Sequence, residues 1–121
     1  MKQLDIKTKH GHLFTCNKCN KFHFEFNQMA IDFSSLKIVE NFYSYLKTID
    51  GNEFERINRN TQYHRKIQIP FPNTTIKLVL SQTDLSEIKT LIENFISKYK
   101  KSEFENQMIK KLSQVSVKQL N

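Results

Sequence analysis

The sequence has few of the residues that mark phosphate-binding loops, disulfide frameworks or membrane helices. Glycine occurs only at Gly11 and Gly51, which excludes a glycine-rich phosphate loop. No run approaches the roughly 18 apolar residues that a membrane helix requires, and residues 1–5 lack the apolar stretch of a signal peptide. We therefore expect a cytoplasmic protein. In that reducing compartment the only two cysteines, Cys16 and Cys19, are expected to be free, metal-bound or redox-active rather than joined in a structural disulfide.

Positive charge is in excess, with a formal net charge of +7 and a sequence pI near 9.5. Lysines are scattered through nearly every segment, which is typical of a solvated surface. Tryptophan is absent, and no strand combines aromatic and basic residues in the manner of single-strand-binding proteins. A nucleic-acid-associated accessory role therefore stays an alternative. It would use the basic residues in the middle of the chain, which are Arg56, Arg59, Arg65 and Lys66.

Two stretches of the chain share one order of predicted elements. Residues 22–46 alternate as two short strands about a turn at Asn27 and Gln28, and a helical pattern follows. Residues 67–95 do the same about a turn at Pro72 and Asn73. We interpret them as a ββα-ββα pseudo-repeat, and chance similarity between two such units is the alternative. The two helical stripes correspond at a constant offset: Leu36, Val39, Phe42, Tyr43 and Leu46 match Leu85, Ile88, Leu91, Ile92 and Phe95.

The predicted fold class is α+β. An antiparallel sheet of four to five strands would be formed by the two hairpins, with the segment from His12 to Cys16 as a further strand, and the two amphipathic helices would cover one face. Ser34 or Ser35 would cap the first helix, and Gly51 would end it. Before the second helix, the side chains of Ser81, Thr83 and Asp84 can cap.

Two segments fall outside this scheme. Residues 52–64 have a weak period and predict a long surface loop anchored by Phe54 or Ile57. Residues 1–100 would form a single α+β domain, and residues 101–121 a C-terminal helical extension, either as a third helix or as a continuation of the second. Its apolar residues must dock on the same domain or on a second copy of the chain, giving a homodimer. These residues are Phe104, Met108, Leu112 and Val115.

The Cys-x-x-Cys spacing gives the strongest indication of chemistry. Two thiols at positions i and i+3 of a tight turn can point the same way, and this spacing supplies half of a tetrahedral zinc site. Strand alternation places His23 near the turn, on the face away from the core. The predicted ligands of one Zn²⁺ ion are Cys16, Cys19 and His23, with His12, or less favourably His10, as the fourth.

Simpler interpretations of the same residues stay open. The thiols can be a pair of small hydrophobic side chains with solvated histidines beside them, or the turn can be what remains of a lost metal site. A catalytic thiol-disulfide role is disfavoured because strands flank the turn, whereas redox cysteines of this spacing open a helix that lowers the thiol pKa.

The Cys-x-x-Cys turn, the following residues 22–27 and the second hairpin at residues 67–81 resemble a family of small uncharacterised bacterial proteins. Members carry such a turn, a nearby histidine and two hairpin-helix units. The resemblance spans residues 11–95 and implies no activity. It supports the fold and draws attention to Cys16, Cys19 and His23.

These observations together predict a non-enzymatic binding or scaffolding module, with a structural zinc ion as its one cofactor. A metal-dependent enzyme with an open zinc site is the further alternative, and it requires an unfilled coordination position within a cleft. The partner, whether another protein, a second copy or nucleic acid, is left open by the sequence.

Overall fold

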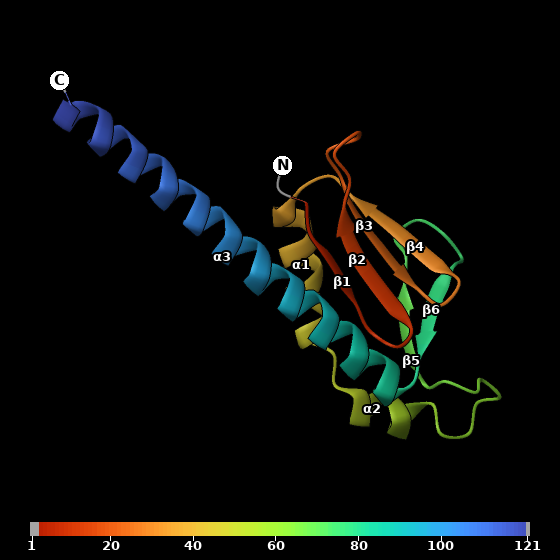
Figure 1. Cartoon of the computed structure of the whole chain (residues 1–121). Coiled ribbons are helices and arrows are strands. Elements are labelled where there is room, and N and C mark those ends of the chain that lie inside the picture. The colour runs from red at the N-terminus through yellow and green to blue at the C-terminus, as the bar shows by residue number, and fades with distance from the viewer. Residues whose placement is uncertain (1–2, 121) are drawn as a thin grey trace.

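The computed structural model describes the backbone of residues 3–120 and the side chains as far as residue 114. The fold is α+β, as predicted, with strands and helices arranged as in Figure 1. In chain order the elements are β1 (Asp5–Lys7), β2 (Gly11–Thr15), β3 (Phe22–Phe26), β4 (Met29–Phe33), α1 (Leu36–Lys47), α2 (Gly51–Ile57), β5 (Ile67–Pro70), β6 (Lys77–Leu80) and α3 (Gln82–Leu120).

The larger sheet is an antiparallel meander in the order β1-β2-β3-β4. Strands β2 and β3 are its two central strands, and Phe24 of β3 lies between Leu13 of β2 and Ile31 of β4. The β3–β4 turn falls at Asn27 and Gln28, as predicted, and Asn27 adopts a left-handed φ of 52°. Asparagine tolerates this conformation better than most residues do, which explains its place in a two-residue hairpin turn.

One face of this sheet is covered by helices. Along β3, Phe22, Phe24 and Phe26 are buried, whereas His23 and Glu25 point to the other face. Helices α1 and α3 lie across the buried face and pack against each other (Figure 1). The two predicted helical stripes form much of the core, since each of their residues is either buried or packed against buried neighbours.

The second hairpin forms a sheet of its own. Strands β5 and β6 pair only with each other, so the prediction of one sheet of four to five strands built from both hairpins is wrong. The fourth strand of the larger sheet is instead β1, which pairs with β2. This three-residue strand was not part of the sequence-based prediction. Ile67, Ile69 and Leu80 still enter the common core. The hairpins therefore share a core without sharing hydrogen bonds, and the pseudo-repeat stays a prediction.

Side chains cap the helices that follow the two hairpins. The Ser35 hydroxyl accepts a hydrogen bond from the Ile38 amide at 3.3 Å, as one of the two predicted caps. At the start of α3 the Ser81 hydroxyl accepts from the Asp84 amide, while the Asp84 carboxylate accepts from the Ser81 amide, each at 3.0 Å. This reciprocal pair is a capping box, which satisfies two backbone donors together.

The segment predicted as a long loop begins with a helix. Gly51 does not end α1 in a left-handed conformation; it is the first residue of α2, and Asp50 caps that helix by accepting from the Glu53 amide at 3.1 Å. Phe54 packs against the core, whereas Ile57 is 61% exposed. The prediction of a loop over residues 52–64 is thus wrong in its first half, because Gly51 starts a helix rather than stopping one.

Helix α3 runs from Gln82 to Leu120 without interruption, so the second predicted helix and the C-terminal helix are one. Its first part contributes to the core as far as Phe95, with Tyr99 packed at the margin. Beyond that point the helix leaves the rest of the fold and projects outward (Figure 1). Val115, one of the apolar residues of the predicted extension, lies outside the residues whose side chains are described. Within the described residues, no helix combines the length and apolar character needed to cross a membrane.

Replacing Phe95 by alanine tests this core. The side chain is fully buried and meets the Phe22 ring edge-on at 5.9 Å, so Phe95→Ala should lower the free energy of unfolding by about 3–5 kcal/mol. Denaturant titration measures the change. The control Ile57→Ala removes a side chain that is 61% exposed and should change stability by less than about 0.5 kcal/mol. Equal effects of the two substitutions would contradict the packing described here.

Candidate metal centre

The cysteines lie in the turn that joins β2 to β3. The Asn20 amide donates to the Cys16 carbonyl at 3.1 Å, and the Cys16 amide donates to the Lys21 carbonyl at 3.3 Å. Asn20 reverses the chain with a left-handed φ of 53°. The backbone between the cysteines therefore curls through about one helical turn, which brings positions i and i+3 to one side.

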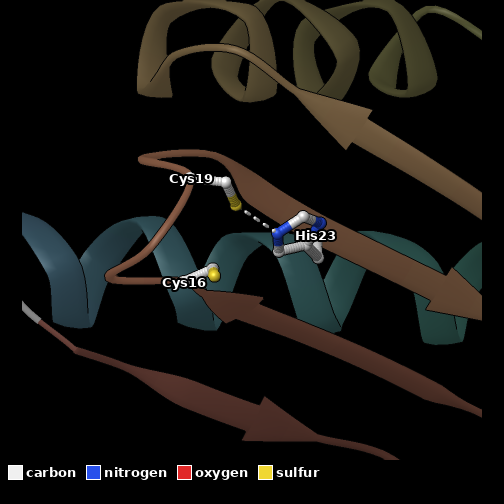
Figure 2. A group of neighbouring side chains, drawn as sticks. All are labelled: Cys16, Cys19 and His23. Atoms are coloured by element: carbon white, nitrogen blue, oxygen red, sulfur yellow. Dashed lines mark hydrogen bonds between the residues drawn. The ribbon is translucent and has the colours of Figure 1, made fainter.

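Three potential ligands converge at this turn (Figure 2). The Sγ atoms of Cys16 and Cys19 and a ring nitrogen of His23 all lie within 4.8 Å of one another. Bond lengths of about 2.0–2.3 Å in a tetrahedral zinc site place the ligand atoms about 3.3–3.8 Å apart, so small shifts of these side chains would bring the group to the geometry that the ion requires. Cys19 is exposed, and Cys16 and His23 are half-buried, which leaves the group open to entering metal.

His23 is held by a carboxylate on the neighbouring strand. Asp32 is its cross-strand partner in β4, and His23 Nδ1 lies 2.7 Å from Asp32 Oδ1. With the Nδ1 proton donated to Asp32, Nε2 presents its lone pair toward Cys19 Sγ, 3.1 Å away. This hydrogen bond to Asp32 is the main reason that the pKa of His23 is raised above its usual value. Metal-binding histidines are commonly oriented by such a carboxylate.

The Cys16 thiol loses its proton more readily than an ordinary cysteine, because its pKa is lowered. The pKa of Cys16 is lowered to about 7. The main cause of this decrease is hydrogen bonding with the Cys19 side chain, and hydrogen bonds with the backbone of Cys19 and Lys18 lower the pKa further. Because the thiolate is the form that binds metal, a substantial fraction of Cys16 is available as a ligand at neutral pH.

The structure does not bring His12 or His10 to this group. His12 Nε2 hydrogen-bonds to Asp5, and the His12 ring stacks on Phe14, which in turn lies against His23. Phe14 thus occupies the position between the two imidazoles. His10, at the other end of β2, contacts Glu87 of α3 at 2.8 Å.

Three of the four central basic residues have partners within the chain. Arg56 is bonded to Glu53 within α2, and Arg65 Nε donates to Asp84 at 2.8 Å. The Lys66 ammonium donates to two backbone carbonyls of the same loop. Arg59 follows α2 in that loop. Three of the four are therefore engaged within the chain, and a nucleic-acid role for them stays a prediction.

A cleft of about 550 Å³ lies at the opposite end of β3 from the cysteine turn. It is lined by the β3–β4 turn, by strand β6 and by the paired side chains of Arg65 and Asp84. The cysteine turn projects from the other end of the hairpin, so this cleft and the three ligands are separate features.

Sequence reasoning found Cys16, Cys19 and His23 but missed Asp32. The signal was present, because a two-residue turn at Asn27 and Gln28 fixes the register of the hairpin and sets His23 opposite Asp32. The same register places both side chains on the face away from the core.

Comparison with known proteins gives a family match. Residues 1–115 match the model of a Family of unknown function (DUF6686). The chain belongs to this family. No curated protein and no solved structure matches the chain. Membership agrees with the resemblance to uncharacterised proteins, and it leaves the chemistry of this DUF6686 member to be argued from its own residues.

Removing the carboxylate partner of His23 tests the geometry without any metal. Asp32→Asn should lower the pKa of His23 toward its usual value, since the hydrogen bond to Asp32 is the main cause of the rise. A titration of the histidine ring protons by NMR measures it. Asp5→Asn is the matched control, because Asp5 pairs with His12 and should leave the His23 titration unchanged. If Asp32→Asn leaves it unchanged as well, the His23–Asp32 pair is absent in solution.

Proposed function

We propose that this protein is a non-enzymatic binding module whose cysteine turn holds one Zn²⁺ ion. The observation that carries the proposal is the convergence of Cys16, Cys19 and His23 within 4.8 Å, with His23 Nδ1 engaged by Asp32. Thiolates are soft donors and imidazole is a borderline one, a combination that suits zinc, whereas calcium and magnesium prefer oxygen ligands.

The metal would act on the hairpin at the centre of the sheet. Cys16 directly follows β2, Cys19 lies in the turn, and His23 is the second residue of β3. One ion bound by all three would link both strands across the turn. It would add to the two backbone hydrogen bonds that Cys16 makes there, with Lys21 and Asn20. Binding free energy at such a site is expressed as stability of the folded hairpin.

Three protein ligands leave one coordination position. We take His12 out of the ligand set, because its ring is bonded to Asp5 and screened by Phe14. The fourth position would face solvent beside the exposed Cys19 and be filled by water or by a side chain of a bound partner. A ligand position that a partner can complete is what gives the turn a binding role.

Metal content tests the proposal. Protein purified without chelator should contain about one zinc per chain, and Cys16→Ser, Cys19→Ser or His23→Ala should reduce it to below about one tenth. His12→Ala is the matched control and should retain zinc. Cobalt(II) substitution should give the intense d–d absorption of a tetrahedral thiolate site. Wild-type protein with less than about one tenth of an equivalent, and with both thiols freely titratable, would rule the site out.

The structural role has its own measure in the same experiment. Removing the zinc with a chelator should lower the melting temperature of the wild-type protein, and adding zinc back should restore it. The Cys16→Ser variant should melt at one temperature with or without chelator. Zinc that is present yet leaves the wild-type melting temperature unchanged would contradict a stabilising role.

Zinc affinity should depend on pH in a defined direction. The pKa of Cys16 is lowered to about 7, and that of His23 is raised, so both groups take up protons as the pH falls below neutrality. Each proton that competes with the metal weakens binding about tenfold per pH unit. Between about pH 7 and about pH 5 the affinity should fall at least that steeply in a competition assay, while circular dichroism verifies that the fold persists. A flat profile would indicate other ligands.

A further inference from the structure

Strand β6 has one open edge. It pairs with β5 on one side, and among the described residues no strand pairs with its other side. The Phe71 amide donates to the Ile76 carbonyl at 3.0 Å, so the hydrogen-bonded positions of β6 recur at every second residue from Leu78 onward. The amide and carbonyl groups of Lys77 and Val79 therefore point away from β5.

This open edge forms one wall of the cleft of about 550 Å³. All four residues of β6 line the cleft, whereas the described residues of β5 do not. Because side chains alternate between the two faces of a strand, lining by consecutive residues indicates the edge rather than a face. The opposite wall is the β3–β4 turn, with the exposed residues Asn27 and Gln28 (Figure 1). Backbone groups without a strand partner thus line a concave space.

The two outer edges of this hairpin differ. On β5, Pro70 lies opposite Lys77, at a pair that is not hydrogen-bonded, so the place of its missing amide is on the side away from β6. Proline at such a position prevents an edge strand from pairing with a further chain. Strand β6 contains no proline. The sequence therefore closes the outer edge of β5 to an added strand and leaves that of β6 open.

A guanidinium group lies at the same cleft. Arg65 Nε donates to Asp84 Oδ2 at 2.8 Å, and the Arg65 side chain is 49% exposed. Within the described chain its two terminal nitrogens make no hydrogen bond, so their donors are available to a ligand. A guanidinium group with free donors matches a carboxylate in geometry and charge. The Lys77 ammonium is engaged elsewhere, because it donates to Gln68 and lies over the Tyr63 ring.

We propose that this cleft binds an extended peptide segment of a partner protein, which adds to β6 as a third strand and places an acidic side chain at Arg65. Main-chain hydrogen bonds to Lys77 and Val79 supply affinity that is independent of peptide sequence, and the guanidinium group supplies the preference for an acidic residue. The net charge of +7 favours the approach of an acidic partner. The cysteine turn lies at the other end of β3, so this binding does not need the zinc ion.

The size of the cleft favours one segment of chain over a second folded copy. Its volume lies within the range of about 300–1,000 Å³ that is typical of ligand pockets. An added strand lies about 4.8 Å from its neighbour, within the cleft, whereas a second copy would have to bring a whole hairpin past the β3–β4 turn. Four strand residues span about 13 Å, so a short peptide suffices as a probe.

Selection of random heptapeptides displayed on phage, with the full chain as bait, supplies that probe. The selected peptides should be rich in aspartate and glutamate, and fluorescence anisotropy of the labelled peptides measures their affinity. Val79→Pro should weaken binding about tenfold, because it removes a backbone donor from the open edge while the ladder with β5 keeps its bonds. Val79→Thr is the matched control, since it retains the amide and should bind as the wild type does.

Hydrogen exchange of the wild-type protein tests strand addition without any substitution. Bound peptide should slow exchange of the Lys77 and Val79 amides at least about tenfold, whereas the Leu78 amide is already paired with β5 and should change little. Peptide binding without this protection overturns the added strand. Protection of the same amides in the free protein, together with a dimeric mass in sedimentation, overturns the peptide in favour of a second copy.

A double-mutant cycle tests the role of Arg65. Arg65→Gln should weaken binding of an acidic peptide about tenfold, and should have little effect on the same peptide with glutamine in place of its acidic residue. A merely structural role would weaken both peptides alike. Arg56→Gln is the matched control, because Arg56 is bonded to Glu53 on α2, and binding should persist. Failure to select any peptide that binds, or equal losses for the two peptides, overturns the proposal.

Discussion

Strand β3 is the constraint on which both the core and the candidate metal centre depend. Its side chains alternate, so the phenylalanines at 22, 24 and 26 are buried while His23 faces away from the core. A shift of one residue in register would turn every side chain of the strand to the other face and expose the core. Burial of three aromatic rings therefore fixes the side from which His23 reaches the cysteine turn. The free energy gained by burying the three phenylalanine side chains thus positions His23, which is not part of that core.

Local pattern predicted the elements of this fold better than their assembly. Period-two alternation located β3, β4, β5 and β6, and helical spacing located α1 and the first part of α3, because these signals depend on which face of an element is buried. Pairing between hairpins leaves no such signal. An alternating strand is half-buried whether it joins a sheet or packs its face against the same core, and β5 and β6 do the latter. The three-residue strand β1 is too short to show a period, and Asp50 with Glu53 was the overlooked signal that α2 begins at Gly51.

The candidate site was predictable to the extent that it is local. Cys16, Cys19 and His23 lie within eight residues of one another, so turn geometry and alternation suffice to group them. Asp32 required the register of the β3–β4 hairpin, which the turn at Asn27 already determines. The prediction of His12 as the fourth ligand rested on strand alternation alone. Alternation correctly sets it on the face away from the core, but that face also carries Phe14, whose ring separates the two imidazoles. Sharing a face is a weaker condition than sharing a site.

The cysteine turn and the point where α3 leaves the rest of the fold are close together in space although they are far apart in sequence. Phe22 is the first residue of β3, directly after the turn, and its ring meets Phe95 at 5.9 Å and Tyr99 at 5.4 Å. Among the described residues of α3, Tyr99 is the last one that packs against the core. Zinc at the turn would restrict the backbone that holds Phe22, and so the support beneath the point where the helix leaves the domain.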